Sequence, residues 1–284
     1  MIIVRLQGGL GNQLFQYAAG KALATHLNKS FKLETITSLQ KDRRRSIALN
    51  DFQAAFDLAS RKEVKRFVQF PSLYRHPVSL FKTGRNIYHE PHFHFDENFF
   101  NIADPVFLDG FWQSPLYFKP IEDSIRKDFR VRAELINNVI EKGKELEGKS
   151  SIAVHVRRGD FLNPKIAAYH GVLDATYFEK AIRLVKDKAA GASVYFFSDD
   201  IDWVKQNLSL DKDAEFVSSF TRSAIEDFYL MTKCRHNIIA NSSFSWWPAW
   251  LNANPDKIVV APEKWFADSS INTNDLIPGN WTRI

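Results

Sequence analysis

The sequence predicts an α/β protein with two compact lobes. From residue 150 onward, short apolar runs alternate with segments of helical periodicity, a pattern typical of a parallel sheet covered by helices. The length of 284 residues lies near the size at which a single hydrophobic core stops growing. The polar, glycine-containing stretch KGKELEGKS at 142–150 has the composition of a domain boundary. We therefore expect an N-terminal lobe over 1–145, a C-terminal lobe over 150–284, and a cleft between them.

The N-terminal lobe begins with a predicted strand, a tight turn and a helix. Residues 1–7 form a short apolar run that ends in glycines, and the following LFQYAAGKALATHL has the spacing of an amphipathic helix. Residues 40–145 show weak periodicity apart from helical stretches near 58–70 and 133–147. The pattern therefore does not predict the architecture of this long segment.

The C-terminal lobe has a regular alternation of elements. The predicted strands are 151–156, 193–198, 215–218, 236–240 and 257–261, and the predicted helices are 175–189, 201–208, 223–234 and 245–252. Ligands of open parallel sheets bind just outside the carboxyl ends of the strands. Polar residues that follow these strands are therefore the first candidates for a binding site.

Composition and charge restrict the class of protein. The net charge of +5 suits an anionic ligand, an acidic membrane surface or nucleic acid, but no helix-turn-helix, zinc-finger or RNP pattern organises the basic residues for nucleic acid. No signal peptide and no apolar window approaching twenty residues is found, so we expect a cytoplasmic protein with at most peripheral contact to the inner membrane. The single cysteine, Cys234, lies in a helical pattern and is expected to be a buried thiol without a catalytic role.

Two arginines follow the predicted strand at 151–156 directly, in the segment SIAVHVRRGDF. Arginine offers forked donors that match the oxygens of a diphosphate, so Arg157 and Arg158 are candidates for an anion clamp. Strand alternation puts His155 and Arg157 on one face and Arg158 on the other. We expect one arginine to hold phosphate and its neighbour to pair with a carboxylate; the alternative is a pair of ordinary surface arginines.

A glycine cluster follows the first predicted strand, in the segment GGLGNQ. Gly8, Gly9 and Gly11 let the backbone pass close to a ligand, and the next helix would point its amides at a phosphate or a sugar. The cluster matches neither a Walker loop nor the full dinucleotide fingerprint. The alternative is a simple turn in which Asn12 caps the helix.

Carboxylates follow the strand at 193–198, in the segment FFSDDID. Asp200 and Asp202 match the Asp-x-Asp pattern that metal-dependent glycosyltransferases use to hold a nucleotide diphosphate. Capping of the next helix by an aspartate is the commoner use of such a junction, and a site with arginines has less need of a cation. We therefore favour Asp199 or Asp200 as an acceptor for a nucleobase or ribose.

A further strand end carries hydroxyl groups, in the segment IIANSSFSWWPAWL. Ser242 and Ser243 can cap the following helix and, with its first amides, bind a phosphate oxygen. Trp246 and Trp247 are expected to pack in the core rather than to form a platform for a sugar.

Three histidines gather in the segment HEPHFHFDE. His89, His92 and His94 are near Asp96 and Glu97 in sequence, and this spacing permits a zinc site without requiring one. Because no cysteine accompanies them, we favour a histidine-rich strand that lines an acceptor cleft over a metal site.

With these motifs in order, the chain resembles the bacterial alpha-1,2-fucosyltransferases of glycosyltransferase family 11 over most of its length. The resemblance is strongest in VRLQGGLGNQLFQYAAGKAL, in HVRRGDF, and in LMTKCRHNIIANSSFSWWPAWL followed by KIVVAPEKWF. It implies a GT-B-like fold with two facing Rossmann-type lobes, an N-terminal lobe for the acceptor and a C-terminal lobe for GDP-fucose. It also implies inversion, no metal or other cofactor, and a galactose-containing oligosaccharide or glycolipid as acceptor.

The resemblance also assigns roles to residues. It implies that Arg157 contacts the donor diphosphate, that His155 and one aspartate of FSDD lie near guanine, and that Ser243 binds phosphate. Arg158, Ser242 and Phe244 are expected beside the donor, and Asn12 is expected to face the fucose or the acceptor.

The sequence does not identify the general base, and two other functions remain as alternatives. Asp160, His170 or a carboxylate of the first lobe are candidates to take the acceptor proton, and we place Asp160 beside Arg157 among the catalytic residues. The first rival is a metal-dependent nucleotide-sugar transferase that uses Asp200 and Asp202. The second is a glycan-binding module without catalysis, which would have no need of paired arginines beside a serine cap.

Overall fold

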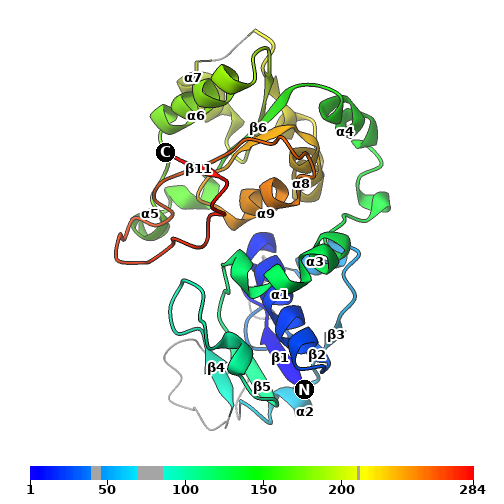
Figure 1. Cartoon of the computed structure of the whole chain (residues 1–284). Helices are drawn as coiled ribbons and strands as arrows, with labels where there is room; N and C mark the ends of the chain where they lie inside the picture. Colours follow the sequence, from blue (N-terminus) through cyan, green and yellow to red (C-terminus); the bar gives the residue numbers. More distant parts are fainter. Residues whose placement is uncertain (40–45, 69–85, 210–211) are drawn as a thin grey trace. The chain divides into compact units, whose positions relative to one another are not determined.

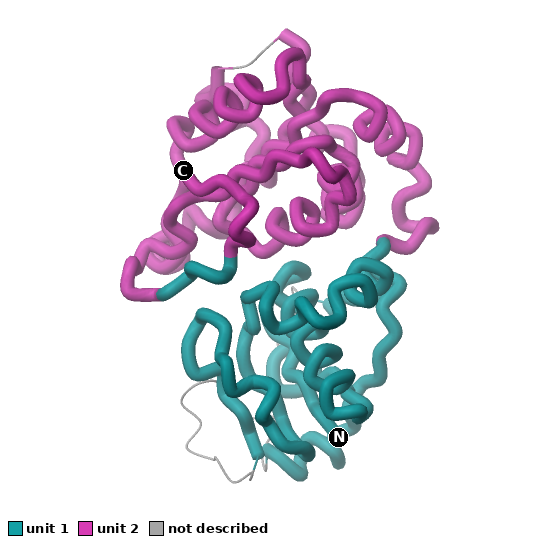
Figure 2. The backbone as a smooth tube through the Cα atoms, viewed as in Figure 1, with its two compact units in different colours: residues 1–130, 272–276 teal, residues 131–271, 277–284 magenta. Residues whose placement is uncertain are grey.

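The protein consists of two compact α/β units. The computed structural model describes residues 1–39, 46–68, 86–209 and 212–284. Unit 1 comprises residues 1–130 and 272–276, and unit 2 comprises residues 131–271 and 277–284 (Figure 2). Each unit is built on its own sheet, and all strand pairs among the described residues are parallel. The α/β class expected from the sequence is confirmed.

Unit 1 has a five-stranded sheet with the order β3-β2-β1-β5-β4. Its strands are β1 (Ile2–Arg5), β2 (Phe31–Glu34), β3 (Asp57–Leu58), β4 (Ile87–His89) and β5 (Val106–Asp109), and its α-helices are α1 (Leu10–His26), α2 (Arg61–Val64) and α3 (Glu122–Asp128) (Figure 1). The predicted strand within 1–7 and the helix after it are confirmed as β1 and α1. The helical stretch predicted near 58–70 is shorter in the structure, where Ser60 and Glu63 form a capping box around the single turn of α2; residues 69–70 lie outside the described ranges.

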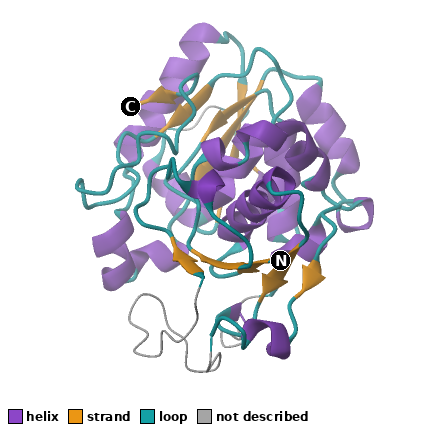
Figure 3. Ribbon diagram, turned by 60° about the horizontal axis from the view of Figure 1, so that its bottom comes forward, coloured by secondary structure: helices purple, strands orange, loops and turns teal. Residues whose placement is uncertain are grey.

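Unit 2 has a six-stranded sheet with the order β11-β10-β9-β6-β7-β8. Its strands are β6 (Ser151–Val156), β7 (Ser193–Ser198), β8 (Glu215–Phe216), β9 (His236–Ile238), β10 (Val259–Ala261) and β11 (Thr282–Arg283), and its α-helices are α4 (Ile140–Glu147), α5 (Pro164–His170), α6 (Ala175–Lys188), α7 (Ile201–Asn207), α8 (Ala224–Lys233) and α9 (Ser243–Leu251). All five strands and four helices predicted for this part of the chain are present, some of them shorter. Figure 3 shows the strands in orange and the accompanying helices in purple.

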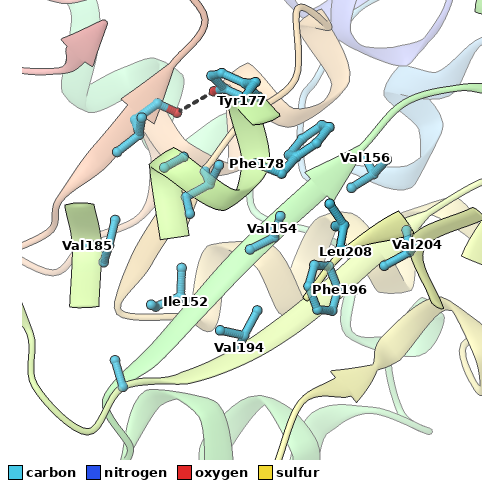
Figure 4. Close-up of a cluster of buried hydrophobic side chains, with 14 residues drawn as sticks. Ile152, Val154, Val156, Tyr177, Phe178, Val185, Val194, Phe196, Val204 and Leu208 are labelled. Carbon is cyan, nitrogen blue, oxygen red and sulfur yellow. Dashed lines mark hydrogen bonds between the residues drawn. The ribbon is translucent and has the colours of Figure 1, made fainter. Parts of the chain in front are cut away.

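The central strand of unit 2, β6, is buried on both faces. On one face, Ile152, Val154 and Val156 pack with residues of α6 that include Phe178 (Figure 4). On the other face, Ala153 packs against the core that α4 and α8 complete. A strand covered on both faces reads as a continuous apolar run, which explains why the sequence pattern indicates β6 so clearly.

The unit boundary differs from the prediction. The chain passes from unit 1 to unit 2 after Arg130, and not at the stretch 142–150. That stretch lies inside unit 2 because α4 packs closely on α8: a Cβ at Gly143 would lie 2.8 Å from Cε1 of Tyr229. Leu146 is fully buried in the same core. Gly143 therefore permits helix packing and does not mark a linker.

Unit 1 also contains a segment from near the end of the chain. The carboxylate of Asp275 accepts hydrogen bonds from the backbone N–H of Phe95 at 2.5 Å and from the hydroxyl of Ser114 at 3.1 Å. These contacts attach residues 272–276 to unit 1, which no local sequence pattern indicates.

The aromatic helix α9 belongs to the core of unit 2. Trp246 and Trp247 are fully buried, and Trp246 stacks on Trp250 with ring centroids 6.1 Å apart. The expectation of core packing is confirmed, as is the burial of Cys234 at the end of α8, where burial raises the pKa of the thiol to about 12. Among the described residues, no helix is long and apolar enough to cross a membrane.

Helix α1 packs against β1 at Gly20, so a substitution of this glycine tests the packing directly. A Cβ at Gly20 would overlap Cγ2 of Val4. We expect Gly20→Ala to lower the free energy of unfolding by about 1–2 kcal/mol, because overpacking outweighs the gain in helix propensity. Urea denaturation would measure the loss. Gly148→Ala is the control, since its Cβ would come no closer than 3.5 Å to a neighbouring atom, and an equal loss there would contradict the packing argument.

Candidate functional site

The polar motifs of unit 2 meet at one edge of its sheet. β9, β6 and β7 are neighbouring parallel strands, and Val156 pairs in register with Ser198 at their carboxyl ends. The arginine and aspartate motifs follow β6 and β7 directly, and the serine motif follows β9 after three residues. Open parallel sheets bind ligands outside the carboxyl ends of their strands, and the sequence predicts these motifs at that position.

Arg157 is held by two carboxylates at this edge. Its Nη2 donates to Asp160 Oδ1 at 2.6 Å, and its Nη1 lies 2.6 Å from Asp199 Oδ2. The guanidinium carbon lies 5.8 Å from the centroid of the Phe161 ring. About a third of the side chain, 32%, remains exposed. Arg157 is therefore a positioned cation that a solute can reach.

Arg158 is engaged differently. Its Nε donates to Asp200 Oδ2 at 3.2 Å, and its guanidinium carbon lies 4.0 Å from the centroid of the Trp203 ring. Only 14% of the side chain is exposed. An arginine stacked on an aromatic ring and paired with a carboxylate fixes local structure, so the geometry favours Arg158 as the arginine that holds the loop.

The two neighbouring aspartates of FSDD also have separate contacts. Asp199 Oδ1 accepts the backbone N–H of Arg158 at 2.9 Å. Asp200 Oδ1 accepts the backbone N–H of Trp203 at 3.1 Å and caps α7, as the capping alternative predicts. Asp202 lies exposed in the first turn of the same helix. No group of three His, Cys, Asp or Glu side chains within the described ranges is arranged to hold a metal ion.

A chain of hydrogen bonds from α8 supports the turn that carries these aspartates. The Asp200 N–H donates to Ser198 Oγ at 2.9 Å, the Ser198 N–H donates to Ser218 Oγ at 3.0 Å, and Ser218 Oγ donates to Asp227 Oδ2 at 2.6 Å. Thr221 also donates to Asp227, at 2.6 Å. No sequence pattern points to these supporting residues, because a serine in a short loop and an aspartate on a helix have many ordinary uses.

His155 is a buried, neutral histidine beside Arg157. Burial, together with the nearby charge of Arg157, lowers its pKa to about 3, and only 5% of the residue is exposed. Its ring lies 5.4 Å from that of Phe244, and within the described part of the protein its Nδ1 is buried with no hydrogen-bond partner. A buried polar atom without a partner is costly, so this nitrogen of His155 is an exception among buried polar groups.

The lowered pKa of His155 predicts how stability depends on pH. Between pH 6.5, the ordinary histidine pKa, and pH 3, the unfolded chain binds a proton that the folded protein excludes. The free energy of unfolding should therefore decrease as the pH falls through this window. The exclusion of a proton by His155 should account for a decrease of about 2–3 kcal/mol between pH 7 and pH 4.5. Urea unfolding of wild type and His155→Asn at both pH values would measure this, and an equally large pH effect in the variant would contradict it.

The N-terminus of α9 completes this edge of the sheet. Ser242 caps the helix by accepting the backbone N–H of Phe244 at 3.3 Å, which confirms its predicted capping role. Ser243 is the first residue of the helix. Asn241 donates from Nδ2 to the carbonyl oxygen of His170 at 2.7 Å and so connects this turn to α5. The positive end of a helix favours a phosphate here.

The two base candidates of unit 2 lie close to Arg157. Asp160 is paired with Arg157, and the ring of His170 stacks on Phe161 with centroids 4.8 Å apart. Burial lowers the pKa of His170 despite the nearby charge of Asp160, so the imidazole is neutral at neutral pH. Both residues are therefore at the same edge as the arginines.

In unit 1, the glycine motif forms a tight connection between β1 and α1. Gly8 has φ +80°, and a Cβ there would overlap the side chain of Asn12. The helix cap is Gly9, so the alternative in which Asn12 caps α1 is wrong. Asn12 instead accepts a hydrogen bond from Gln113 Nε2 at 2.9 Å, which links the loop to the segment after β5.

The histidines of unit 1 do not form a common cluster. His89 Nδ1 lies 3.2 Å from Asp109 Oδ2 at the end of the sheet. His92 and His94 stack on each other with ring centroids 3.6 Å apart, and His92 Nδ1 lies 2.9 Å from the carbonyl oxygen of His94. His92 and His94 thus lie together, and His89 lies beside a buried carboxylate.

Comparison with known proteins relates this chain to glycosyltransferases. The family model described as "Glycosyl transferase family 11" matches residues 1–284. The Escherichia coli O-antigen biosynthesis glycosyltransferase WbnK is 35% identical, with 98% of this chain and 99% of that protein covered. The Escherichia coli alpha-1,2-colitosyltransferase is 31% identical, with 100% and 99% covered. The crystal structure of NodZ alpha-1,6-fucosyltransferase soaked with GDP-fucose has the same fold, with 18% identity, a TM-score of 0.51, and 88% of this chain and 91% of that chain covered.

Proposed function

The chain belongs to glycosyltransferase family 11, and from that premise we propose that it transfers L-fucose from GDP-fucose to the 2-hydroxyl of a terminal galactoside, with inversion and without a metal ion. The observation that carries this proposal is Arg157, a reachable cation held in place at the carboxyl edge of a parallel sheet. It follows the buried His155 closely in the chain, and the His155 ring in turn packs on Phe244 in the first turn of α9.

The chemistry of unit 2 supports a nucleoside diphosphate sugar as donor. Arg157 and the amides at the start of α9 match the oxygens of a diphosphate, while the neutral ring of His155 offers one hydrogen-bonding nitrogen to a base or phosphate. The NodZ crystal with the same fold was soaked with GDP-fucose, which agrees with this donor class. We assign donor binding to unit 2 and acceptor binding to unit 1, where Asn12 and Gln113 lie at the glycine loop.

The proposed reaction develops charge on the departing GDP. The acceptor oxygen forms a bond to C1 of fucose while the bond from C1 to the diphosphate oxygen breaks, and both electrons of that bond stay on GDP. The acceptor proton leaves to water or to a nearby base. A cation already held at the diphosphate stabilises the charge as it forms, which is the largest catalytic contribution that this site offers.

Metal independence is part of the proposal and is supported by how the carboxylates are engaged. Asp200 caps α7 and pairs with Arg158, which leaves it poorly placed to share a cation with Asp202. The net charge of +5 also provides cations for an anionic donor and is compatible with acceptors presented at an acidic membrane surface in the cytoplasm.

Colitose is the second candidate for the transferred sugar. The alpha-1,2-colitosyltransferase is 31% identical over the whole of this chain, so family membership alone does not assign the sugar. The name of that relative supports a 1,2 linkage in the product.

The test is acceptor-dependent release of GDP from GDP-fucose, with lactose or N-acetyllactosamine as acceptor and excess EDTA throughout. We expect turnover in EDTA and a product whose linkage to the galactose 2-hydroxyl is visible by NMR. Turnover only after addition of manganese would replace the proposal by a metal-dependent reaction at Asp200 and Asp202. Preference for GDP-colitose in a parallel assay would show that the transferred sugar is colitose and not fucose. Binding of glycan without any binding of GDP, measured by calorimetry, would favour the glycan-binding module.

A further inference from the structure

Three contacts of the site meet at the carboxylate of Asp199. Its Oδ2 lies 2.6 Å from Nη1 of Arg157, and its Oδ1 accepts the backbone N–H of Arg158 at 2.9 Å. Gly159 lies against the same carboxylate, where a Cβ would be 2.5 Å from Asp199 Oδ2. One carboxylate at the end of β7 therefore touches three consecutive residues of the arginine motif.

This arrangement determines where the Arg157 guanidinium lies. Arg157 has a long side chain with many rotamers, and 32% of it is exposed, so packing alone does not hold it. Asp160 and Asp199 each hold one nitrogen of the guanidinium, at 2.6 Å. Asp160 is local, three residues along the chain, whereas Asp199 follows the neighbouring strand and is anchored through the supported turn after β7.

We propose that Asp199 is a positioning residue that preorganises Arg157 for the leaving diphosphate, and that Gly159 is needed because a side chain there would displace the Asp199 carboxylate. The inference rests on the proposed function, because it concerns the reaction that Arg157 assists. It replaces the expectation that Asp199 contacts the nucleobase or ribose. A cation that is already in place costs no reorganisation when charge develops, so loss of Asp199 should reduce turnover more than donor binding.

The first test is Asp199→Asn, which is close to isosteric. The amide oxygen of asparagine can still accept the N–H of Arg158, so the turn keeps its hydrogen bond while the ion pair to Arg157 is lost. We expect kcat for fucosyl transfer to fall by about tenfold to a hundredfold, with KM for GDP-fucose and the Kd for GDP changed by less than about threefold. A wild-type kcat in this variant would overturn the inference.

The second test uses Gly159→Ala, alone and combined with Asp199→Ala. Alone, it should reduce kcat as Asp199→Asn does, because the new Cβ forces the carboxylate away from Arg157. In the Asp199→Ala background the clash partner is gone, so Gly159→Ala should add less than about twofold. Additive losses in this cycle would overturn the explanation for Gly159. Gly279→Ala is the matched control, since nothing lies within 4 Å of its Cβ, and Asp213→Asn is the control for removal of an exposed aspartate.

The third test separates positioning from general damage. In an Arg157→Ala background, Asp199→Asn should cause no further loss of kcat, because its effect passes through Arg157. Equal additional loss in that background would overturn the inference, while thermal melts of every variant report folding. If the wild-type protein shows no fucosyl transfer, the proposed function is refuted. If the wild type is active and Asp199→Asn has the same kcat, only this inference is refuted.

Discussion

Replacement of Arg157 by alanine should reduce kcat for fucosyl transfer by roughly a thousandfold, with little change in stability. Removal of one preorganised donor from a developing oxyanion costs about a hundredfold to a thousandfold, and Arg157 also contributes its charge. Its side chain is 32% exposed and makes its ion pairs with the partly exposed Asp160 and Asp199, so the core does not depend on it. Steady-state GDP release and a thermal melt of the same sample would measure both quantities.

Two further substitutions give this prediction its controls. Arg157→Lys keeps the charge but lacks the forked donors that reach Asp160 and Asp199 together, so it should recover only a small part of the activity. Arg158→Ala should act mainly on stability, because Arg158 is stacked on Trp203 and paired with Asp200. Substantial turnover in Arg157→Ala would remove this arginine from the reaction, and the reverse pattern, with Arg158 essential and Arg157 dispensable, would exchange their roles.

Replacement of Arg5 by leucine should destabilise unit 1 by about 3–5 kcal/mol, the usual loss when one partner of a buried ion pair is removed. At the end of β1, Arg5 Nη1 donates to the fully buried Asp109 at 2.8 Å and Nε donates to Thr37 Oγ1 at 2.9 Å. The Thr37 hydroxyl in turn donates to Glu34, whose pKa is raised by burial although the Thr37 bonds and Arg5 act against it. Leucine would leave the Asp109 carboxylate buried without this partner.

Arg126→Leu is the matched control for this substitution within unit 1. Its ion pair with Glu122 is a partly exposed i,i+4 pair on α3, which is worth about 0.5 kcal/mol or less. Urea unfolding, followed by near-UV absorbance or fluorescence, would compare the two variants. If the Arg5→Leu protein were as stable as Arg126→Leu, the ion pair of Arg5 with Asp109 would not contribute to the stability of unit 1 as predicted.

The arginine and serine motifs of unit 2 can be placed from sequence because their signals are local. A strand such as β6, buried on both faces, gives a continuous apolar run, and the residues that follow a parallel strand must emerge at its carboxyl edge. The capping roles of Asp200 and Ser242 are local for the same reason, since a cap bonds to amides two or three residues away.

The linker interpretation of 142–150 was wrong because the packing partner of Gly143, Tyr229, lies far along the chain and leaves no local signal. The alternative in which Asn12 caps α1 was wrong as well, and its partner Gln113 is equally distant in sequence. The histidine spacing likewise says nothing about the carboxylate of Asp109 that lies beside His89. Periodicity describes which face of an element is apolar, but it does not say which element covers that face.

From the residues alone followed the α/β class, the order of strands and helices along the chain in unit 2, and the polar residue types at the carboxyl ends of its strands, because each depends on neighbours within a few positions. The tertiary structure assigned the two arginines to different carboxylates, brought Asp199 against Arg157 from the end of another strand, and attached residues 272–276 to unit 1. These contacts arise from strand order and packing, which join segments distant in sequence through buried surface and hydrogen bonds that local patterns do not encode.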